Sequence, residues 1–210
     1  MQAEQVLVVP RQRIAGYLAA CEKGLISDSA FVDEILAAIH ADAFFMDRSL
    51  AERDPSYKQI IPYVTICRND QILMIRRKKK QNEARLHDLY SIGQGGHINP
   101  LRELQGKALI QAELQRELLE EIALAPDQYV LVPGGIINDD LTEVGSVHLG
   151  LWYTAETSSE EFRTNEPDKI EGSWVHRREV LEKYATLETW SQIVADSLLR
   201  EGRPCTGKIA

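Results

Sequence analysis

The sequence predicts an α/β (α+β) fold built around a mixed β-sheet. Several short segments are rich in β-branched and aromatic residues, one long helical segment lies among them, and further helical segments follow near the C-terminus. Strands interleaved with helices are typical of layered domains, in which helices pack on a sheet. The 210 residues, of which 44% are hydrophobic and 27% charged, suffice for one substantial domain and an appended element.

The N-terminal part, residues 1–57, is predicted to be a helical extension packed on a main domain that covers residues 58–210. Residues 11–40 carry apolar side chains at helical spacing, and the Asp-Ser pair at 28–29 is suited to cap the second helix. Residues 46–58 are polar and contain a proline, so we expect a linker there.

The main domain begins with a predicted β-hairpin. Residues 60–67 and 71–75 are β-rich, and Arg68-Asn69-Asp70 between them is a turn signal. The further expected strands cover residues 89–92, 130–137, 145–154 and 171–175. The expected helices cover residues 106–123, 178–183 and 187–199.

Composition narrows the functional classes. The formal net charge of −8 argues against binding to a nucleic-acid backbone, although it is compatible with a small phosphorylated substrate. No apolar run approaches the roughly 20 residues of a membrane helix, and the N-terminus has no secretory pattern. Cys21, Cys67 and Cys205 show no disulfide or metal-ligand spacing. We therefore expect a cytoplasmic protein that acts on a small molecule.

Carboxylates gather on one face of the helix expected at 106–123. Glu117, Glu120 and Glu121 stand at i, i+3 and i+4, and Glu113 lies one turn earlier. Like charges at this spacing repel each other, and a bound hard cation would offset the repulsion, since such ions prefer oxygen ligands. The alternative is a solvated acidic surface. A neighbouring apolar stripe suited to pack on the sheet consists of Ile110, Leu114, Leu118 and Ile122.

The turn before this helix favours the metal site. Gly95-Gly96 follows a short strand, and adjacent glycines let the backbone approach a ligand closely or adopt a positive φ. The strand, the Gly-Gly pair, the loop and then Arg116-Glu117-Leu118-Leu119-Glu120-Glu121 form a rare combination.

This combination resembles the Nudix family, whose sequence box ends in Arg-Glu-apolar-x-Glu-Glu-x-Gly-apolar. Residues 116–122 match that half, and Gly96 is the equivalent of the box's first glycine. The resemblance implies an α/β/α sandwich and hydrolysis of a diphosphate linkage in a nucleoside diphosphate derivative or similar compound. It further implies Mg²⁺ (or Mn²⁺) held by Glu117, Glu120 and Glu121, with Arg116 as a structural brace.

The box departs from the family pattern in two places. Gly96 and Arg116 are six residues further apart than in the family, which implies an insertion within 99–107, with Glu103 as a stand-in for the box's first Glu. Ala123 replaces the late glycine, and because alanine suits a helix better than glycine, we expect the helix to continue slightly further.

The resemblance also implies a carboxylate from a late loop as general base or extra ligand. Glu166, in an acidic loop before a Trp-containing strand, is the first candidate and Glu171 the second. The two residues that we expect to be catalytic are Glu120 and Glu166. The other candidates are Asp139, Asp140 and Glu143.

Four residues are expected to contact the substrate: Gly95, Gly96, Arg76 and His97. Arg76 or Arg77 begins a cationic run, 76–80, that would offer charge-assisted hydrogen bonds to phosphate, although a solvated turn is the alternative. For His97, and for His148 in a predicted strand, the alternative is a structural hydrogen bond.

The expected reaction is the attack of water on one phosphorus of the diphosphate, with metal-assisted lowering of the water's pKa and a glutamate as base. Two alternatives stay open. One is a non-catalytic nucleotide-sensing module of the same fold, and the other is an isopentenyl-diphosphate-isomerase-like enzyme, which would need a cysteine such as Cys67. A homodimer is one alternative for the oligomeric state, since homodimers are common.

Overall fold

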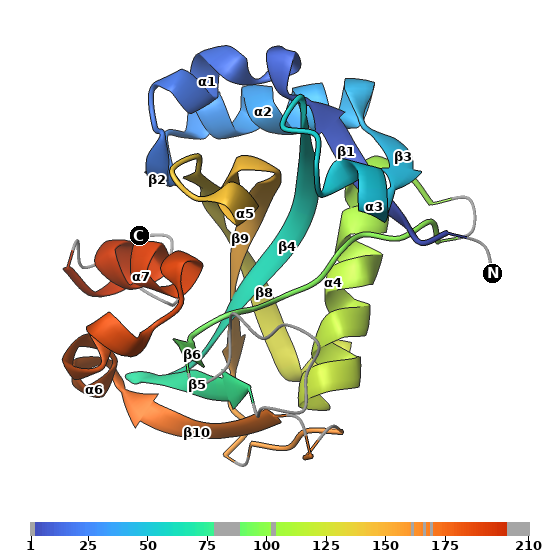
Figure 1. Ribbon diagram of the computed structural model, residues 1–210. Helices are drawn as coiled ribbons and strands as arrows, with labels where there is room; N and C mark the ends of the chain where they lie inside the picture. The colour runs from blue at the N-terminus through green and yellow to red at the C-terminus, as the bar shows by residue number, and fades with distance from the viewer. Residues whose placement is uncertain are drawn as a thin grey trace. The chain divides into compact units, whose positions relative to one another are not determined.

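The computed structural model (Figure 1) describes residues 3–77, 89–101, 104–160, 162–165, 167–168 and 170–200. The described strands are β1 (Gln5–Pro10), β2 (Lys23–Ile26), β3 (Phe44–Asp47), β4 (Tyr57–Arg68), β5 (Gln71–Arg77), β6 (Tyr90–Ser91), β7 (Gln94–Gly95), β8 (Tyr129–Asp139), β9 (His148–Thr157) and β10 (Ile170–His176). They belong to one sheet, which confirms the expected α/β (α+β) class with a large mixed sheet.

The described helices are α1 (Ala15–Ala19), α2 (Ser29–Asp42), α3 (Arg48–Ala51), α4 (Gly106–Ile122), α5 (Glu143–Ser146), α6 (Arg177–Glu182) and α7 (Thr189–Ala195), the last continued by a π-helical turn at Asp196–Arg200. None of the helices in this part of the chain combines the length and apolar character needed to cross a membrane. The chain divides into two compact units, and each is described by itself.

The first unit comprises Met1–Tyr63, Gly95–Leu114 and Gly134–Trp152. Its strand β1 pairs antiparallel with both β3 and β4, and β2 pairs antiparallel with β8. Residues 1–57 therefore contribute three strands to the sheet as well as helices. The boundary expected at residues 57 and 58 stays a prediction.

Two local expectations for this N-terminal segment are wrong. Residues 11–40 are not helical throughout, because β2 separates α1 from α2, and residues 46–58 are not a linker, because they contain α3 and the ends of β3 and β4. The physical reason is the same in both places: the strands are stabilised by partners that are distant in sequence. The expected cap of α2 is confirmed, since the Asp28 carboxylate accepts bonds from the N–H groups of Ala30 and Phe31 at 3.0 and 3.1 Å.

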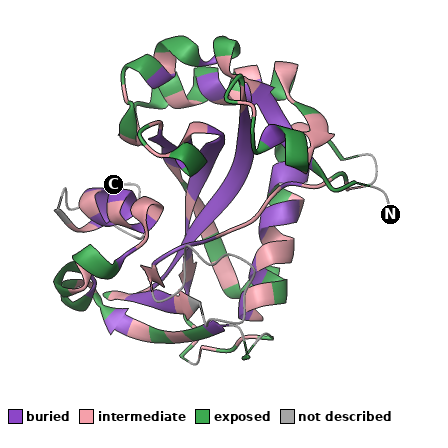
Figure 2. Ribbon diagram, in the orientation of Figure 1, coloured by how far each residue is buried: buried purple, intermediate pink, exposed green. Residues whose placement is uncertain are grey.

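The second unit comprises Val64–Gln94, Gln115–Pro133 and Tyr153–Ala210. The predicted hairpin is confirmed: β4 and β5 pair across the turn, where Asn69 has a φ of 51°. Strand β10 pairs antiparallel with β5 along its whole length, and β6 pairs with the end of β5. Figure 2 shows how little of β4 reaches the surface, since ten consecutive residues from Lys58 to Cys67 are buried.

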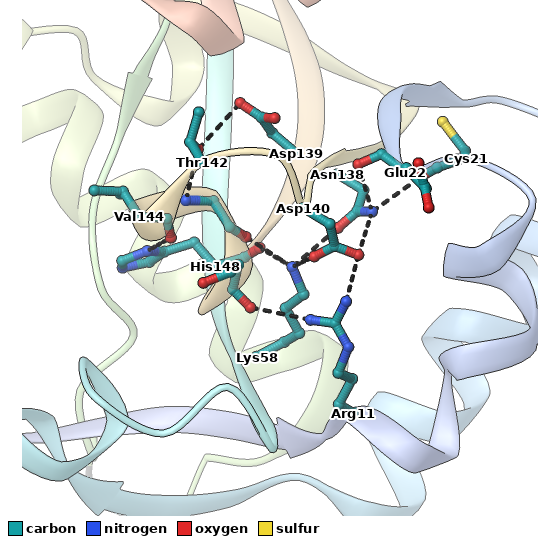
Figure 3. A network of polar contacts seen from close by, with 12 residues as sticks. Arg11, Cys21, Glu22, Lys58, Asn138, Asp139, Asp140, Thr142, Val144 and His148 are labelled. Atoms are coloured by element: carbon teal, nitrogen blue, oxygen red, sulfur yellow. Dashed lines mark hydrogen bonds and ion pairs between the residues drawn. The ribbon is translucent and has the colours of Figure 1, made fainter.

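Lys58, the first of those buried residues, organises the polar interior of the first unit (Figure 3). Its side chain is fully buried, and Nζ donates to Asp140 Oδ1 at 2.6 Å, to the carbonyl of Gly145 at 2.7 Å and to Asn138 Oδ1 at 3.0 Å. A buried ammonium group needs such partners, because desolvating a charge without compensation costs several kcal/mol. A fourth acceptor is the carbonyl of His148 at 3.1 Å, so the acceptors come from the end of β8, the segment that follows it and the start of β9.

Asp140 extends this network to the N-terminal segment. Its second carboxylate oxygen accepts from Arg11 at 2.5 Å, and Arg11 also donates to the carbonyl of Ser146 at 3.1 Å. Burial alone would raise the pKa of Asp140, but the bonds from Lys58, Asn138 and Arg11 hold it below the ordinary value of 3.8. Burial also lowers the pKa of Lys58, and Asp140 offsets part of that effect.

Replacing Asp140 with asparagine removes the charge that compensates Lys58. We expect Asp140→Asn to lower the free energy of unfolding at neutral pH by about 3 kcal/mol, the usual effect of breaking a buried ion pair. A carboxyl group with a depressed folded pKa stabilises the fold above its unfolded pKa, and this contribution is lost as pH falls through the folded value. The difference between parent and variant in denaturant titrations should therefore shrink below about pH 4.

Asp33→Asn is the matched control, because Asp33 is exposed on α2. Its free energy of unfolding should stay within about 0.5 kcal/mol of the parent. Equal stability of Asp140→Asn and the parent at neutral pH would contradict the assigned role of the Lys58–Asp140 pair.

Candidate active site

The carboxylates expected to bind metal lie in the second unit, on the C-terminal half of α4. Arg116 Nη2 lies 2.6 Å from Glu117 Oε1, and Arg116 Nη1 lies 2.6 Å from Glu120 Oε2. The Glu120 side chain is 59% exposed and that of Glu117 is 19% exposed. Two of the three glutamates therefore converge on a single cationic group.

The chemistry of this donor set fits a hard divalent cation. Glu117, Glu120 and Glu121 offer only carboxylate oxygens, which Mg²⁺ and Mn²⁺ prefer, and they lie within about one helical turn. Among the described residues, however, no group of three or more His, Cys, Asp or Glu side chains is arranged so that it could hold a metal ion.

The C-terminal end of α4 differs from the expectation. The helix does not run past Ala123 but ends at Ile122, and Ala123 adopts the left-handed conformation with a φ of 55°. Outside the helix, Leu124 is buried, and its N–H donates to the carbonyl of Leu118 at 3.2 Å. The family's box has glycine at this position, and the backbone here has the conformation that favours glycine.

Side chains from a distant loop hold this helix end. Thr164 Oγ1 donates to the carbonyl of Glu121 at 2.6 Å, and Asn165 Nδ2 donates to the carbonyl of Leu119 at 3.0 Å. These bonds satisfy carbonyl groups that a helix end leaves without an intrahelical donor. The local bond from Leu124 N–H and these tertiary contacts together hold the helix end, and they outweigh the helix preference of alanine.

The Gly95-Gly96 pair lies in the first unit. Neither glycine has a positive φ. A Cβ atom on Gly95 would lie 2.7 Å from the carbonyl oxygen of Pro62, so glycine is required there by close packing against β4. The close approach that the structure shows is to a strand, and the expected approach to a ligand stays a prediction.

The start of the loop in which the insertion is inferred, at Ile98 and Asn99, contacts the N-terminal segment inside the first unit. Leu7 N–H donates to the carbonyl of Ile98 at 2.9 Å, and Asn99 Nδ2 donates to the carbonyl of Gln5 at 2.8 Å. Glu103, the expected stand-in, lies outside the described residues. The lengthened loop and the N-terminal strand β1 therefore support each other.

The two histidines singled out from the sequence contact each other in the first unit. Their Nε2 atoms are 3.4 Å apart, and His148 Nδ1 lies 2.7 Å from the carbonyl of Val144. A carbonyl can only accept, so His148 Nδ1 carries a proton, and in the neutral pair His97 Nε2–H donates to His148 Nε2. This contact ties the loop after Gly96 to the start of β9.

Arg76, the expected phosphate contact, lies in the second unit opposite Glu171. Nη1 of Arg76 is 3.6 Å from Glu171 Oε1, and both side chains are exposed by more than a third. The guanidinium also lies 5.8 Å from the ring centroid of Tyr90, and Lys183 Nζ lies 4.6 Å from the same centroid. Most of the cationic run, residues 78–80, lies outside the described residues.

The other candidate carboxylates differ in their surroundings. Glu166, the first candidate for the general base, lies outside the described residues. Asp140 is bound by Lys58 and Arg11, and Asp139 is buried, with Oδ2 3.9 Å from Lys23 Nζ. Glu143 is exposed on α5.

Sequence reasoning missed two features of these sites. Lys58 lies at the end of the segment expected to be a linker, and the β-rich run that begins two residues later, at Ile60, carries no signal that Lys58 is buried. Thr164 and Asn165 carry no local signal, because their role depends on the position of α4.

The conformation of Ala123 predicts a stability change. A non-glycine residue in the left-handed region costs roughly 1–2 kcal/mol, and the greater unfolded-state entropy of glycine offsets about 0.4–1 kcal/mol. We therefore expect Ala123→Gly to raise the free energy of unfolding by about 1 kcal/mol, measured by denaturant titration.

The matched control is Ala37→Gly, at an exposed position inside α2. There the same substitution should lower the free energy of unfolding by about 1 kcal/mol, because glycine disfavours a helix interior. A loss of stability in both variants would show that Ala123 is not strained.

Comparison with known proteins supports the family suggested by the box. The chain is 36% identical over 200 residues to protein YmaB of Bacillus subtilis (strain 168), which covers 93% of this chain and 97% of that protein. The solved structure of Tm1382, named as a Nudix hydrolase, is 29% identical with a TM-score of 0.78, over 94% of this chain and 100% of Tm1382.

The structure of DR0079 from Deinococcus radiodurans shares the fold, with a TM-score of 0.54 at 16% identity, over 86% of this chain and 99% of DR0079. No protein-family model matches the chain. The Arg-Glu-x-x-Glu-Glu segment on α4 and the likeness to Tm1382 agree, and the chain belongs to the Nudix hydrolase family.

Proposed function

We propose that this Nudix hydrolase uses Mg²⁺ (or Mn²⁺) to cleave the diphosphate linkage of a nucleoside diphosphate derivative or a similar small molecule. The observation that carries the proposal is the convergence of Glu117 and Glu120 on one cationic group, Arg116, on the helix that carries the family's box. Carboxylates that already lie close enough together to bind one cationic group are suited to bind a metal ion.

Glu117, Glu120 and Glu121 would hold the metal, and Arg116 would keep the first two side chains in place. A divalent ion bound there supplies charge neutralisation for the phosphoryl oxygens and a lowered pKa for the attacking water. Glu166 is our candidate for the base that accepts the proton of this water, and Glu171 is the second candidate. The products would be a phosphate monoester and the remaining phosphorylated fragment.

Gly95, Gly96, His97 and Arg76 are the proposed substrate contacts. For Arg76, the ion pair with Glu171 is half exposed and therefore weak, so exchanging this carboxylate for a phosphate oxygen costs little. We further propose that the enzyme acts on small molecules and not on nucleic acid, because its net charge of −8 disfavours binding to a nucleic-acid backbone. The proposed location is the cytoplasm. A homodimer is the proposed assembly.

Two other activities are compatible with the fold but have less support. An isomerase acting on an isoprenoid diphosphate would need a cysteine facing the substrate, and the Cys67 side chain is fully buried. A nucleotide-sensing module would not need the three box glutamates, all of which are present.

Glu120→Gln tests the metal site. The substitution keeps the size of the side chain but removes the charge of the expected ligand. Its position is exposed, so stability should change by no more than about 0.5 kcal/mol. Turnover of diphosphate compounds with Mg²⁺ or Mn²⁺, read as phosphate released by a coupled phosphatase, should fall at least about 100-fold.

Glu182→Gln is the matched control, because Glu182 is exposed on α6. This variant should turn over substrate as the parent does. Unchanged turnover in Glu120→Gln would refute the assigned metal site. Tight nucleotide binding by the parent with no product after prolonged incubation with metal would support the sensing module instead.

A further inference from the structure

The first unit contains two histidine rings, those of His97 and His148, that meet at their Nε2 atoms. These atoms lie 3.4 Å apart, and the ring centroids lie 5.5 Å apart. Two nitrogen atoms that bind one Zn²⁺ ion at about 2.0–2.1 Å and at a tetrahedral angle are separated by about 3.4 Å. The spacing that lets one imidazole donate a hydrogen bond to the other is therefore also the spacing at which both can bind one metal ion.

The ring of His148 is oriented as a metal ligand requires. Its Nδ1 atom lies 2.7 Å from the carbonyl oxygen of Val144 and donates its proton there (Figure 3), so the lone pair is on Nε2, the atom that meets His97. Histidines that bind metal commonly donate the other ring N–H to a backbone carbonyl or a carboxylate, which fixes the tautomer and makes the ligand nitrogen more basic. His148 is only 6% exposed, so the surrounding side chains also hold its ring in place.

The backbone on both sides of the histidine pair is held by further contacts. The carbonyl of His148 accepts a bond from Lys58 Nζ at 3.1 Å. Next to His97, the carbonyl of Ile98 accepts a bond from Leu7 N–H at 2.9 Å. The distance between the two rings is thus supported by contacts other than their own, and an incoming metal ion meets two nitrogen atoms that are already close together.

The ligand atoms decide which kind of metal suits this pair. Imidazole nitrogen suits Zn²⁺ and the neighbouring transition metals, whereas carboxylate oxygen suits Mg²⁺ and Mn²⁺. The three box glutamates lie in the second unit and offer oxygen atoms, whereas the histidine pair lies in the first unit and offers nitrogen atoms. The two sets of side chains therefore favour different ions.

We propose that His97 and His148 bind a transition-metal ion, Zn²⁺ being the expected one, through their Nε2 atoms. In the neutral pair, His97 carries its proton on Nε2, and this proton moves to Nδ1 when the metal binds. The N–H···N bond is replaced by two nitrogen–metal bonds with no net change in bound protons, and water fills the other positions of the ion. The metal then joins the loop after Gly96 to the start of β9, whatever reaction the box glutamates support.

Zinc binding can be measured without catalysis. The full chain is freed of metal with EDTA, dialysed, and titrated with ZnCl₂ by calorimetry in the presence of excess Mg²⁺. We expect saturable binding, together with shifts of the Cε1–H NMR signals of His97 and His148. The melting temperature should rise with the Zn²⁺ concentration, because an ion that binds the folded chain and not the unfolded chain stabilises the fold.

His97→Gln and His148→Gln each remove one ligand. Each should weaken Zn²⁺ binding at least about tenfold, since even the loss of a hydrogen-bond partner of a metal ligand lowers the affinity by roughly 10- to 100-fold. Each should also abolish the rise in melting temperature. The matched control is His176→Gln, because His176 is exposed where β10 ends and α6 begins, and this variant should bind Zn²⁺ as the parent does.

The proposal is overturned if the parent does not bind Zn²⁺, or if His97→Gln binds it as tightly as the parent. Loss of binding in Glu120→Gln but not in His97→Gln would place the ion on α4 and would overturn the proposal as well. If His148→Gln does not fold, His97→Gln decides alone, since its position is half-buried. Turnover with Mg²⁺ tests the proposed function separately.

Discussion

The buried ammonium group of Lys58 is the constraint on which the first unit depends. A charge at that depth has to be surrounded by acceptors, and they come from Asn138, Asp140 and the carbonyl of Gly145. Asp140 in turn binds Arg11, so the N-terminal segment is joined to the strands by charge as well as by backbone pairing. The N-terminal segment is therefore part of the sheet and its polar interior, and the lengthened loop after Gly96 is held by the same segment.

Helix α4 differs from the surroundings of Lys58, because it carries several negatively charged side chains close together near the surface. Arg116 neutralises Glu117 and Glu120 together, at 2.6 Å from each, which keeps two expected metal ligands close without leaving their repulsion uncompensated. The more exposed of the two ion pairs, Arg116–Glu120, contributes little to the stability of the fold. Its importance is positional, because Arg116 holds the two carboxylates near each other, as the proposed metal site requires.

The end of this helix is held by residues that are distant in sequence. Ala123 adopts a conformation that glycine would adopt at lower cost, and the loop residues Thr164 and Asn165 hold the carbonyls beside it. The Cβ atom of Ala123 strains the backbone at this point.

Local patterns in the sequence determined the elements whose stabilising contacts are close along the chain: the hairpin around Asn69, the cap at Asp28, and the helix with its buried stripe and its glutamates at i, i+3 and i+4. The Arg-Glu-x-x-Glu-Glu spacing also identified the family. Tertiary structure alone decided the features whose partners are remote. The strand β2 exists because it pairs with β8, and Lys58 is buried because acceptors eighty and more residues away surround it. The carbonyls at the end of α4 are bound by a loop forty residues later. The spacing of apolar residues predicts which face of a helix or strand is buried, but it does not predict which distant residues pack against that face.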